Sequence, residues 1–271
     1  MEDKQYQTAK RAAAEKKRRA VTDKLSPIIA LVLLVAVWAA VCGFGSIPSY
    51  MLPSPGAVIR AFVSDFPLLM EHAAVTLTEA FAGLGIGIAL AFVTASLMDR
   101  FRGLYQALYP LLVVSQTIPT VAIAPLLISW MGFDMAPKIT LVVLTTFFPI
   151  TVGLLDGYKS VDADAISLFR SMGAGNGIIF RRIKLPSAMS HFFSGLKISA
   201  SYAIVGAVIA EWLGGFEGLG VYMTRVRKAY SFDKMFAVIL LIIIISLLLM
   251  GLVTLLKKAA MPWERKGVQE V

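Results

Sequence analysis

Met235–Leu256, MFAVILLIIIISLLLMGLVTLL, is a run of 22 residues that contains no Asp, Glu, Lys or Arg. An apolar run of about 18 or more residues is long enough to cross a bilayer as an α-helix. Four further stretches lack these residue types, namely Leu25–Ile59, Ala80–Met98, Gly103–Phe133 and Ile139–Leu155. The 271-residue chain is 58% hydrophobic and 16% charged, whereas soluble domains are about 25% charged. Because a soluble core of this size cannot bury so many apolar runs, the sequence predicts an all-α integral membrane protein.

Six membrane-spanning helices account for this pattern, at 25–44, 73–98, 106–130, 138–156, 190–212 and 234–257. The fifth is the least regular, because Lys197 interrupts it and Glu211 closes it. A lysine near a helix end can extend its ammonium to the lipid headgroups, so the span remains plausible.

Basic residues set the expected orientation of these spans. Eight precede the first span, two lie between the second and third, five between the fourth and fifth, and four follow the sixth, whereas six lie on the opposite side. Cytoplasmic segments carry the excess of Lys and Arg, so we expect both termini to be cytoplasmic. The net charge of +9 does not point to nucleic acid, because the basic residues flank apolar spans.

The expected organisation has three parts. Residues 1–24 form a basic cytoplasmic arm that orients the chain and contacts lipid headgroups. Residues 25–257 form the transmembrane domain, with a patterned loop at 158–186, and residues 258–271 form a cytoplasmic tail. The single cysteine, Cys42, cannot form an intramolecular disulfide and says little about compartment.

Prolines interrupt the third span at Pro110, Pro119 and Pro125. Irregular backbone at membrane depth is tolerated where protein or a water-filled cavity supplies hydrogen-bond partners. We therefore expect Gln116, Thr117 and Pro119 to line a translocation path. An ordinary proline-kinked packing helix explains the same residues, and the sequence leaves both interpretations open.

The loop from Tyr158 to Pro186, YKSVDADAISLFRSMGAGNGIIFRRIKLP, has helical periodicity of its own. One helical face carries Val161, Ala165, Leu168, Phe169 and Met172. Ser160 or Asp162 can cap its amino end, and glycines follow from Gly173. We expect a second short helix, Ile178–Leu185, to run into Pro186. From physics alone, the apolar face can lie on the bilayer, on its own bundle or in another protein's groove.

The same loop resembles a known family. Gly173, Ile183, Leu185 and Pro186 match the closing half of the signature of binding-protein-dependent ABC importer permeases. The segments LPSP, IPTVAIAPL and AEWLGGFEGLG and the pair Pro262-Trp263 are similar to the nitrate/sulfonate/taurine-type branch, and the resemblance covers nearly the whole chain.

The resemblance implies the six-helix fold of type I importers, with a coupling helix between helices 4 and 5. It also implies a permease homodimer in a prokaryotic cell membrane, two cytoplasmic ATPase subunits and an extracytoplasmic solute-binding protein. ATP and Mg would be bound by the ATPase, so the chain itself would be a transport subunit and not an enzyme. The implied ATPase-coupling residues are Asp164, Ala165, Leu168, Phe169, Met172, Gly173, Ile183, Leu185 and Pro186.

The chain departs from the family signature at its opening Glu-Ala-Ala, where Ser167, Leu168 and Phe169 stand. The acidic contact to the ATPase is therefore missing at that place. Asp164, one turn earlier, is a candidate substitute, and docking is expected to rely more on Leu168 and Phe169.

Other classes of protein lack support in the residues. No G-x-x-x-x-G-K-[ST] phosphate loop occurs, and Gly83, Gly85 and Gly87 are better explained by close helix packing than by dinucleotide binding. His72 and His191 have no metal-ligand spacing and are expected at the membrane interfaces. An ion-coupled secondary transporter would keep ionisable relays within its spans, whereas Glu79, Lys197 and Glu211 can all lie near span ends.

Glu211 and Trp212 close the fifth span before four glycines, 214, 215, 218 and 220. One interpretation is that Glu211 marks the water interface. The other is that Glu211 and Trp212 line the outer mouth of the path, with Glu211 paired to Arg225 or Arg227 and the glycines allowing the loop to move as a gate.

The substrate is harder to predict, because selectivity in this family resides largely in the binding protein. The run from Ala210 to Val238 resembles permeases for the thiamine pyrimidine precursor. Sulfonates, taurine and nitrate are the alternatives within the same branch.

Overall fold

The computed structural model describes residues 25–45, 48 and 50–262. The predicted basic arm 1–24, Ile47 and most of the predicted tail, including Trp263, lie outside the described residues. Within the described part, every regular element is a helix.

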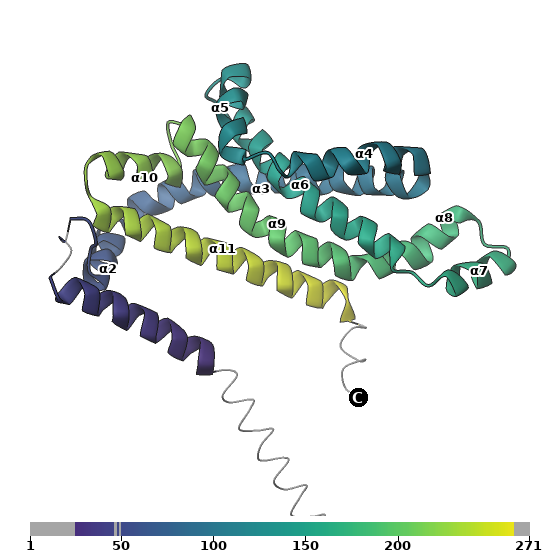
Figure 1. Ribbon diagram of the computed structural model, residues 1–271, viewed down its shortest axis with the longest axis horizontal. Coiled ribbons are helices and arrows are strands. Elements are labelled where there is room, and N and C mark those ends of the chain that lie inside the picture. The colour runs from purple at the N-terminus through teal and green to yellow at the C-terminus, as the bar shows by residue number, and fades with distance from the viewer. Residues whose placement is uncertain (1–24, 46–47, 49, 263–271) are drawn as a thin grey trace, which may run out of the picture.

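The chain begins with the helix Leu25–Gly43. There follow α2 (Pro55–Ser64), α3 (Phe66–Arg100), α4 (Arg102–Ser115), α5 (Thr120–Met131), α6 (Met135–Lys159), α7 (Ala163–Ser171), α8 (Asn176–Ile179), a π-helical turn η1 (Phe180–Lys184), α9 (Leu185–Leu213), α10 (Leu219–Lys228) and α11 (Phe232–Ala260). The long helices α3, α6, α9 and α11 lie along one direction, with α7 at one end of the molecule and α2 and α10 at the other (Figure 1).

Five of the helices are long and apolar enough to cross a membrane, and the bent pair α4–α5 makes a sixth if it is counted as one span. With that pair counted as one span, the described residues accommodate the six predicted spans. The observed helices are generally longer than predicted, since α3 begins at Phe66 and α11 continues to Ala260.

Of the two interpretations left open for the third span, the structure favours interrupted backbone over a kinked but continuous helix. The helices α4 and α5 meet at an angle of 100°, with the break at Gln116–Pro119. Pro119 adopts extended backbone, with φ −61° and ψ 125°, and α5 begins directly after it. Pro110 and Pro125 lie inside helices that continue through them. Only one of the three prolines therefore marks the break.

Two short helices were not predicted. The first, α2, begins at Pro55, and the hydroxyl oxygen of Ser54 accepts the Ala57 N–H at 3.3 Å. A Ser cap followed by Pro in the first turn is a known helix start, so this helix could have been recognised. The second, α10, follows Gly218, whose φ of +118° suits glycine.

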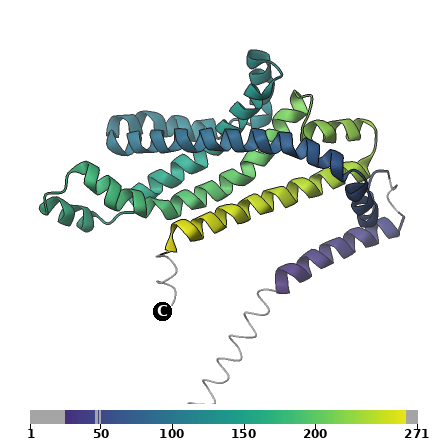
Figure 2. The ribbon, with the colours of Figure 1, turned by 180° about the vertical axis from the view of Figure 1, so that it is seen from behind.

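The amino-terminal helix Leu25–Gly43 stands apart from the four long helices (Figure 2). None of the residues in its most apolar window is buried within the chain. It contacts the rest of the molecule at Trp38, whose ring stacks on Phe236 of α11 with centroids 5.8 Å apart. Its apolar surface therefore faces lipid or another protein.

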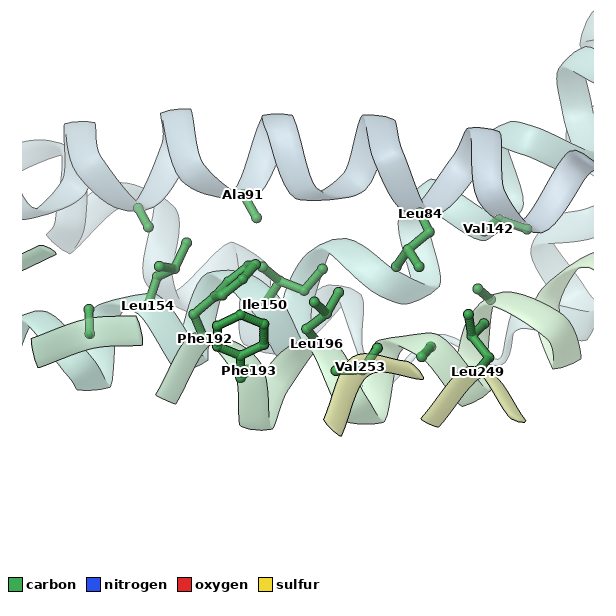
Figure 3. Close-up of a cluster of buried hydrophobic side chains, with 14 of the residues drawn as sticks. Leu84, Ala91, Val142, Ile150, Leu154, Phe192, Phe193, Leu196, Leu249 and Val253 are labelled. Atoms are coloured by element: carbon green, nitrogen blue, oxygen red, sulfur yellow. The ribbon is translucent and has the colours of Figure 1, made fainter. Parts of the chain in front are cut away.

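The largest hydrophobic cluster lies between α3, α6, α9 and α11 (Figure 3). In Figure 3, Ala91 of α3 lies opposite Ile150 of α6 and the ring of Phe192 of α9, while Val253 of α11 covers the other side. In lipid, such helices associate mainly through van der Waals packing, so the stability of the bundle depends on close contact between them.

Glycines bring α6 close to its neighbours. A methyl group added at Gly83 of α3 would lie 2.5 Å from Val142 Cβ, and one at Gly157 of α6 would lie 2.5 Å from the Cα of Ala188. Gly87 is equally tight, whereas Gly85 has nothing within 4 Å of an added Cβ. Close packing is thus confirmed for two of the three glycines in the GLGIG run.

The residues Asn176–Leu213 form one helical run of 38 residues. The predicted short helix Ile178–Leu185 is therefore not a separate element, and Pro186 does not end it. Pro186 follows the π-helical turn η1 directly, and the helical run continues through it.

Candidate functional site

The helix α7 has defined ends on both sides. The Asp162 carboxylate accepts the N–H of Asp164 at 3.0 Å and caps the amino end, which confirms one of the two predicted caps. At the carboxyl end, Gly173 has φ +82°. Its N–H donates to the Arg170 carbonyl, and the Ala174 N–H donates to the Phe169 carbonyl, both at 2.9 Å. These two bonds form a Schellman motif, which requires a residue that tolerates positive φ.

The apolar stripe of α7 divides into an exposed and a half-buried part. Leu168 is 60% exposed and Met172 is 75% exposed, whereas Ala165 and Phe169 are half-buried. Among the other predicted coupling residues, Asp164, Gly173 and Pro186 are exposed and Ile183 and Leu185 are half-buried. The surface available for docking on α7 is therefore centred on Leu168 and Met172, with Phe169 at its edge.

The loop that carries α7 is tied to the long helices. Lys184 Nζ lies 2.7 and 2.9 Å from the two carboxylate oxygens of Asp99, at the end of α3. The ring of Phe180 packs on Tyr158 of α6 with centroids 5.3 Å apart. These two contacts join η1, which follows the α7 loop, to α3 and α6.

A cavity of about 250 Å³ lies beside the break between α4 and α5. Residues of α6 and α9 complete its half-open lining, which consists of Ser115, Gln116, Ile118, Thr120, Ile123, Leu144, Thr145, Tyr202, Val205, Gly206 and Ile209. Of the predicted path residues in the break, Gln116 lines this cavity. Thr117 and Pro119 lie in the break without lining it.

The other predicted path residues, Glu211 and Trp212, border a separate pocket of about 620 Å³ at the α10 end. Arg225 lines the same pocket. Both Arg225 and Arg227 are exposed in the last turn of α10. Within the described part of the chain, neither arginine forms an ion pair with Glu211.

Glu211 instead belongs to a buried polar network. It is 1% exposed; its Oε1 accepts the hydroxyl of Thr76 at 2.7 Å, and its Oε2 accepts the N–H of Gly220 at 2.6 Å. The interpretation of Glu211 as a marker of the water interface is therefore wrong, because its side chain is enclosed by protein. The expected pairing with an arginine is replaced by a hydroxyl and a backbone N–H.

The network extends along one face of α3. The residues His72, Thr76 and Glu79 are spaced by 4 and 3, which places them on one side of the helix. His72 Nδ1 accepts the N–H of Gly218 at 3.1 Å, and Thr76 Oγ1 accepts the N–H of Leu219 at 2.9 Å. His72 is thus buried within the protein, whereas His191 is exposed.

Glu79 forms the one fully enclosed ion pair among the described residues. Its Oε1 lies 2.8 Å from Nζ of Lys138, and both side chains are almost completely buried. Its Oε2 has no hydrogen-bond partner among the described residues. We call His72, Thr76, Glu79, Lys138 and Glu211 the buried polar seam.

The seam lies close to the α10 end of the long helices. Glu79 is the fourteenth residue of α3, well inside the helix. It nevertheless lies level with the first turn of α6 and the last turn of α9, where Lys138 and Glu211 stand. Glu79, Lys138 and Glu211 are therefore buried near the α10 end, where Glu79 and Lys138 form an ion pair.

The glycines after α9 allow the loop backbone to pack closely against Glu211 and Lys138. A side chain at Gly218 or Gly220 would collide with the carboxylate or Cβ of Glu211, and one at Gly215 would lie 3.2 Å from Lys138 Nζ. The loop 214–220 is therefore packed onto the seam through its backbone. The movement that the gate interpretation requires would have to break this packing.

On the far side, α10 is held by Asp65, which precedes α3. Its carboxylate accepts the hydroxyl of Tyr222 and pairs with Lys234 Nζ at 2.9 Å. Burial alone would raise the pKa of Asp65, but hydrogen bonds from Tyr222 and Lys234 hold that pKa below its ordinary value. The helix α10 is thus fixed on both sides.

Several of these residues were missed from the sequence. The spacing of His72, Thr76 and Glu79 on one face of a span was a usable signal. Lys138 looked like an ordinary flanking charge, and Thr145 and Tyr202 resembled core residues. Nothing in the local sequence distinguished these three.

Comparison with known proteins gives consistent matches. The model of the family described as "binding-protein-dependent transport system inner membrane component" matches residues 83–261. A probable ABC transporter permease protein of Haemophilus influenzae is 38% identical, covering 83% of this chain and 92% of the relative. A formylaminopyrimidine transport permease protein of Halalkalibacterium halodurans is 35% identical, covering 89% and 97%.

Two further matches are more distant. A putative aliphatic sulfonates transport permease protein of Bacillus subtilis is 27% identical, covering 85% of this chain and 84% of the relative. Among solved structures, the MetNI methionine ABC transporter in an inward-facing conformation aligns with a TM-score of 0.64 at 18% identity, covering 72% of this chain and 97% of that chain. The structural match supports the fold alone.

Proposed function

Because this chain belongs to the family of binding-protein-dependent transport system inner membrane components, and is a permease subunit of an ABC importer, we propose that it imports formylaminopyrimidine. The observation that carries this choice is the relative of that name, which matches over almost its whole length. An aliphatic sulfonate is the alternative, supported by a more distant relative.

The family also implies partners, an ATPase and a binding protein. We place the ATPase at the α7 end and the binding protein at the α10 end. The support is the distribution of basic residues, which predicts a cytoplasmic α7 loop and cytoplasmic termini. ATP and Mg are then held by the ATPase chain, and two copies of the permease form the translocation path between them.

The exposed part of α7 is the proposed docking surface for the ATPase. Leu168 and Met172 project from a helix whose two ends are capped, so the surface is rigid. Large apolar side chains exposed side by side on a loop are typical of a protein contact. The continuous helical run Asn176–Leu213 then links this loop to Glu211 at the other end of the molecule. Movement of the ATPase is transmitted through that helix to the outer loop.

The docking surface is tested by substituting Leu168 and Met172 with Asp together. Burying two such side chains contributes about 3–6 kcal/mol in a docked helix, so the double variant should no longer copurify with the ATPase. The matched control is the pair Ser167→Asp and Ser171→Asp, which adds the same charges to α7 off the apolar stripe. Retention of the ATPase by the Leu168 and Met172 variant, or loss of it by the control, would show that docking lies elsewhere.

The substrate is tested in proteoliposomes that contain the permease, its ATPase and the cognate binding protein. ATP-dependent uptake of labelled formylaminopyrimidine is expected, with no uptake of labelled ethanesulfonate. The opposite result would assign the chain to the sulfonate alternative. Identification of the small molecule that copurifies with the binding protein provides an independent check.

A further inference from the structure

The cavity beside the α4–α5 break has a lining that is polar but carries no charge. Among the described residues, no Asp, Glu, Lys, Arg or His lines it. Its polar groups are neutral and come from Ser115, Gln116, Thr120, Thr145 and Tyr202. Its remaining lining is aliphatic apart from Gly206.

The hydrogen-bonding capacity of this lining is largely unused. Thr145 and Ser115 donate to the carbonyls of Val142 and Leu112 in their own helices, which leaves their oxygens able to accept. In the part of the chain that the structure describes, the Gln116 amide and the Tyr202 hydroxyl have no hydrogen-bond partner. The cavity thus offers both donors and acceptors to a solute.

The electrostatics of the cavity disfavour an anion. An anion that leaves water loses its hydration and needs a cation or several aimed donors in return. The amino end of α5 carries a partial positive charge, but the carboxyl end of α4 meets it at the same break with the opposite sign. The one cation of the buried polar seam, Lys138, is already paired with Glu79. Among the described residues of one chain, no cation therefore lines the cavity to compensate a sulfonate.

Lys197 is the one lysine within α9, so its position relative to the cavity matters. The residues of α9 that line the cavity are Tyr202, Val205, Gly206 and Ile209, spaced along one face. Ile198, one turn before Tyr202, continues that face, and Lys197 is rotated from it by about 100°. Lys197 is exposed and is not part of the lining.

We propose that this cavity is the specificity site of the permease and that it selects an uncharged, flat heteroaromatic solute over an anion. Tyr202 is 49% exposed and offers an aromatic face for stacking. Gln116 presents an amide that matches a ring edge with one donor and one acceptor. The volume of about 250 Å³ lies just below the roughly 300–1,000 Å³ of typical ligand pockets, which fits a single substituted ring. This inference rests on the proposed function and adds a site and a chemical reason to it.

The test measures binding without the binding protein, so that selectivity of the permease is isolated. The permease–ATPase complex in lipid nanodiscs is equilibrated with labelled formylaminopyrimidine, and competition by unlabelled ethanesulfonate is measured. Binding should fall at least tenfold in Gln116→Leu and in Tyr202→Ala. It should be unchanged in the matched control Ile198→Ala, which lies outside the cavity on the same helix face. Ethanesulfonate in tenfold excess should not displace the probe.

A transport measurement separates this role from a structural one. In proteoliposomes, the two cavity variants should lose uptake tenfold or more while ATP hydrolysis stimulated by the binding protein stays within twofold of wild type. A folding defect would lower both. Displacement by ethanesulfonate, or unaltered binding and uptake in both cavity variants, would overturn the inference. Absence of ATP-dependent uptake by the wild-type complex would instead refute the proposed function, and the nanodisc measurement decides the specificity site separately.

Discussion

Replacing Lys138 by methionine leaves Glu79 buried without its cation. Methionine keeps the unbranched shape of the lysine stem, so the change is mainly one of charge. Glu79 is 0% exposed and its second oxygen already lacks a hydrogen-bond donor among the described residues. Removing one partner of a buried pair costs about 3–5 kcal/mol. For a chain of this size each kcal/mol corresponds to roughly 2–4 °C, so the melting temperature should fall by roughly 6–20 °C.

The assay compares Lys138→Met, Glu79→Gln and the double variant. Each is heated in detergent, and the fraction that still elutes as a monodisperse peak gives Tm. The double variant should recover most of the loss, because removing both charges leaves neither one buried alone. The control is Lys234→Met, whose pair with Asp65 is 40% exposed on the lysine side and should contribute less than about 1 kcal/mol.

Two results would refute this reasoning about the seam. One is a Tm for Lys138→Met within about 2 °C of wild type. That result would mean that Glu79 and Lys138 do not form a buried ion pair. The other is a double variant whose loss equals the sum of the single losses, because independent sites add and coupled ones do not.

Four further outcomes are expected. Glu211→Gln should reduce solute uptake in proteoliposomes while the ATPase still copurifies; normal uptake would exclude a role in the outer gate. Gly157→Ala should destabilise the protein by about 1–3 kcal/mol through overpacking, seen as a lower Tm, whereas Gly85→Ala, with open space around it, should be neutral or slightly stabilising. In intact cells, a cysteine at Gly173 should resist an impermeant thiol reagent and one at Phe216 should react; the reverse pattern would invert the topology.

The membrane helices could be predicted from the sequence because their signal is local. A charge-free run of sufficient length can be recognised without knowing its neighbours, as Met235–Leu256 shows. The cap at Asp162 and the end at Gly173 are local in the same sense, and both were confirmed. The short helix α2 had a local signal too, in Ser54 and Pro55, but ten residues are too few to show a reliable apolar period.

The buried polar seam could not be predicted in full, because its contacts depend on how the helices pack. Glu79 and Lys138 are 59 residues apart in the chain, and Thr76 and Glu211 are 135 apart. The sequence prediction considered only charged side chains as partners of Glu211 and therefore favoured an arginine. It did not consider backbone N–H groups as donors. The Gly220 N–H becomes available only because glycines let the loop approach.

The π-helical turn η1 has a consequence for how this chain tolerates changes in length. An i→i+5 turn holds one residue more than an α-helical turn, so it can take up a residue without rotating the helix after it. Deleting exposed Arg182 should return the turn to α-helix and keep α8 and α9 in phase. Deleting Ser194, inside α9, should rotate the two parts of the helix by about 100° relative to each other. The variant that lacks Arg182 should still copurify with the ATPase, whereas the variant that lacks Ser194 should not. The turn η1 is therefore the point in this 38-residue helical run where the loss of one residue is tolerated.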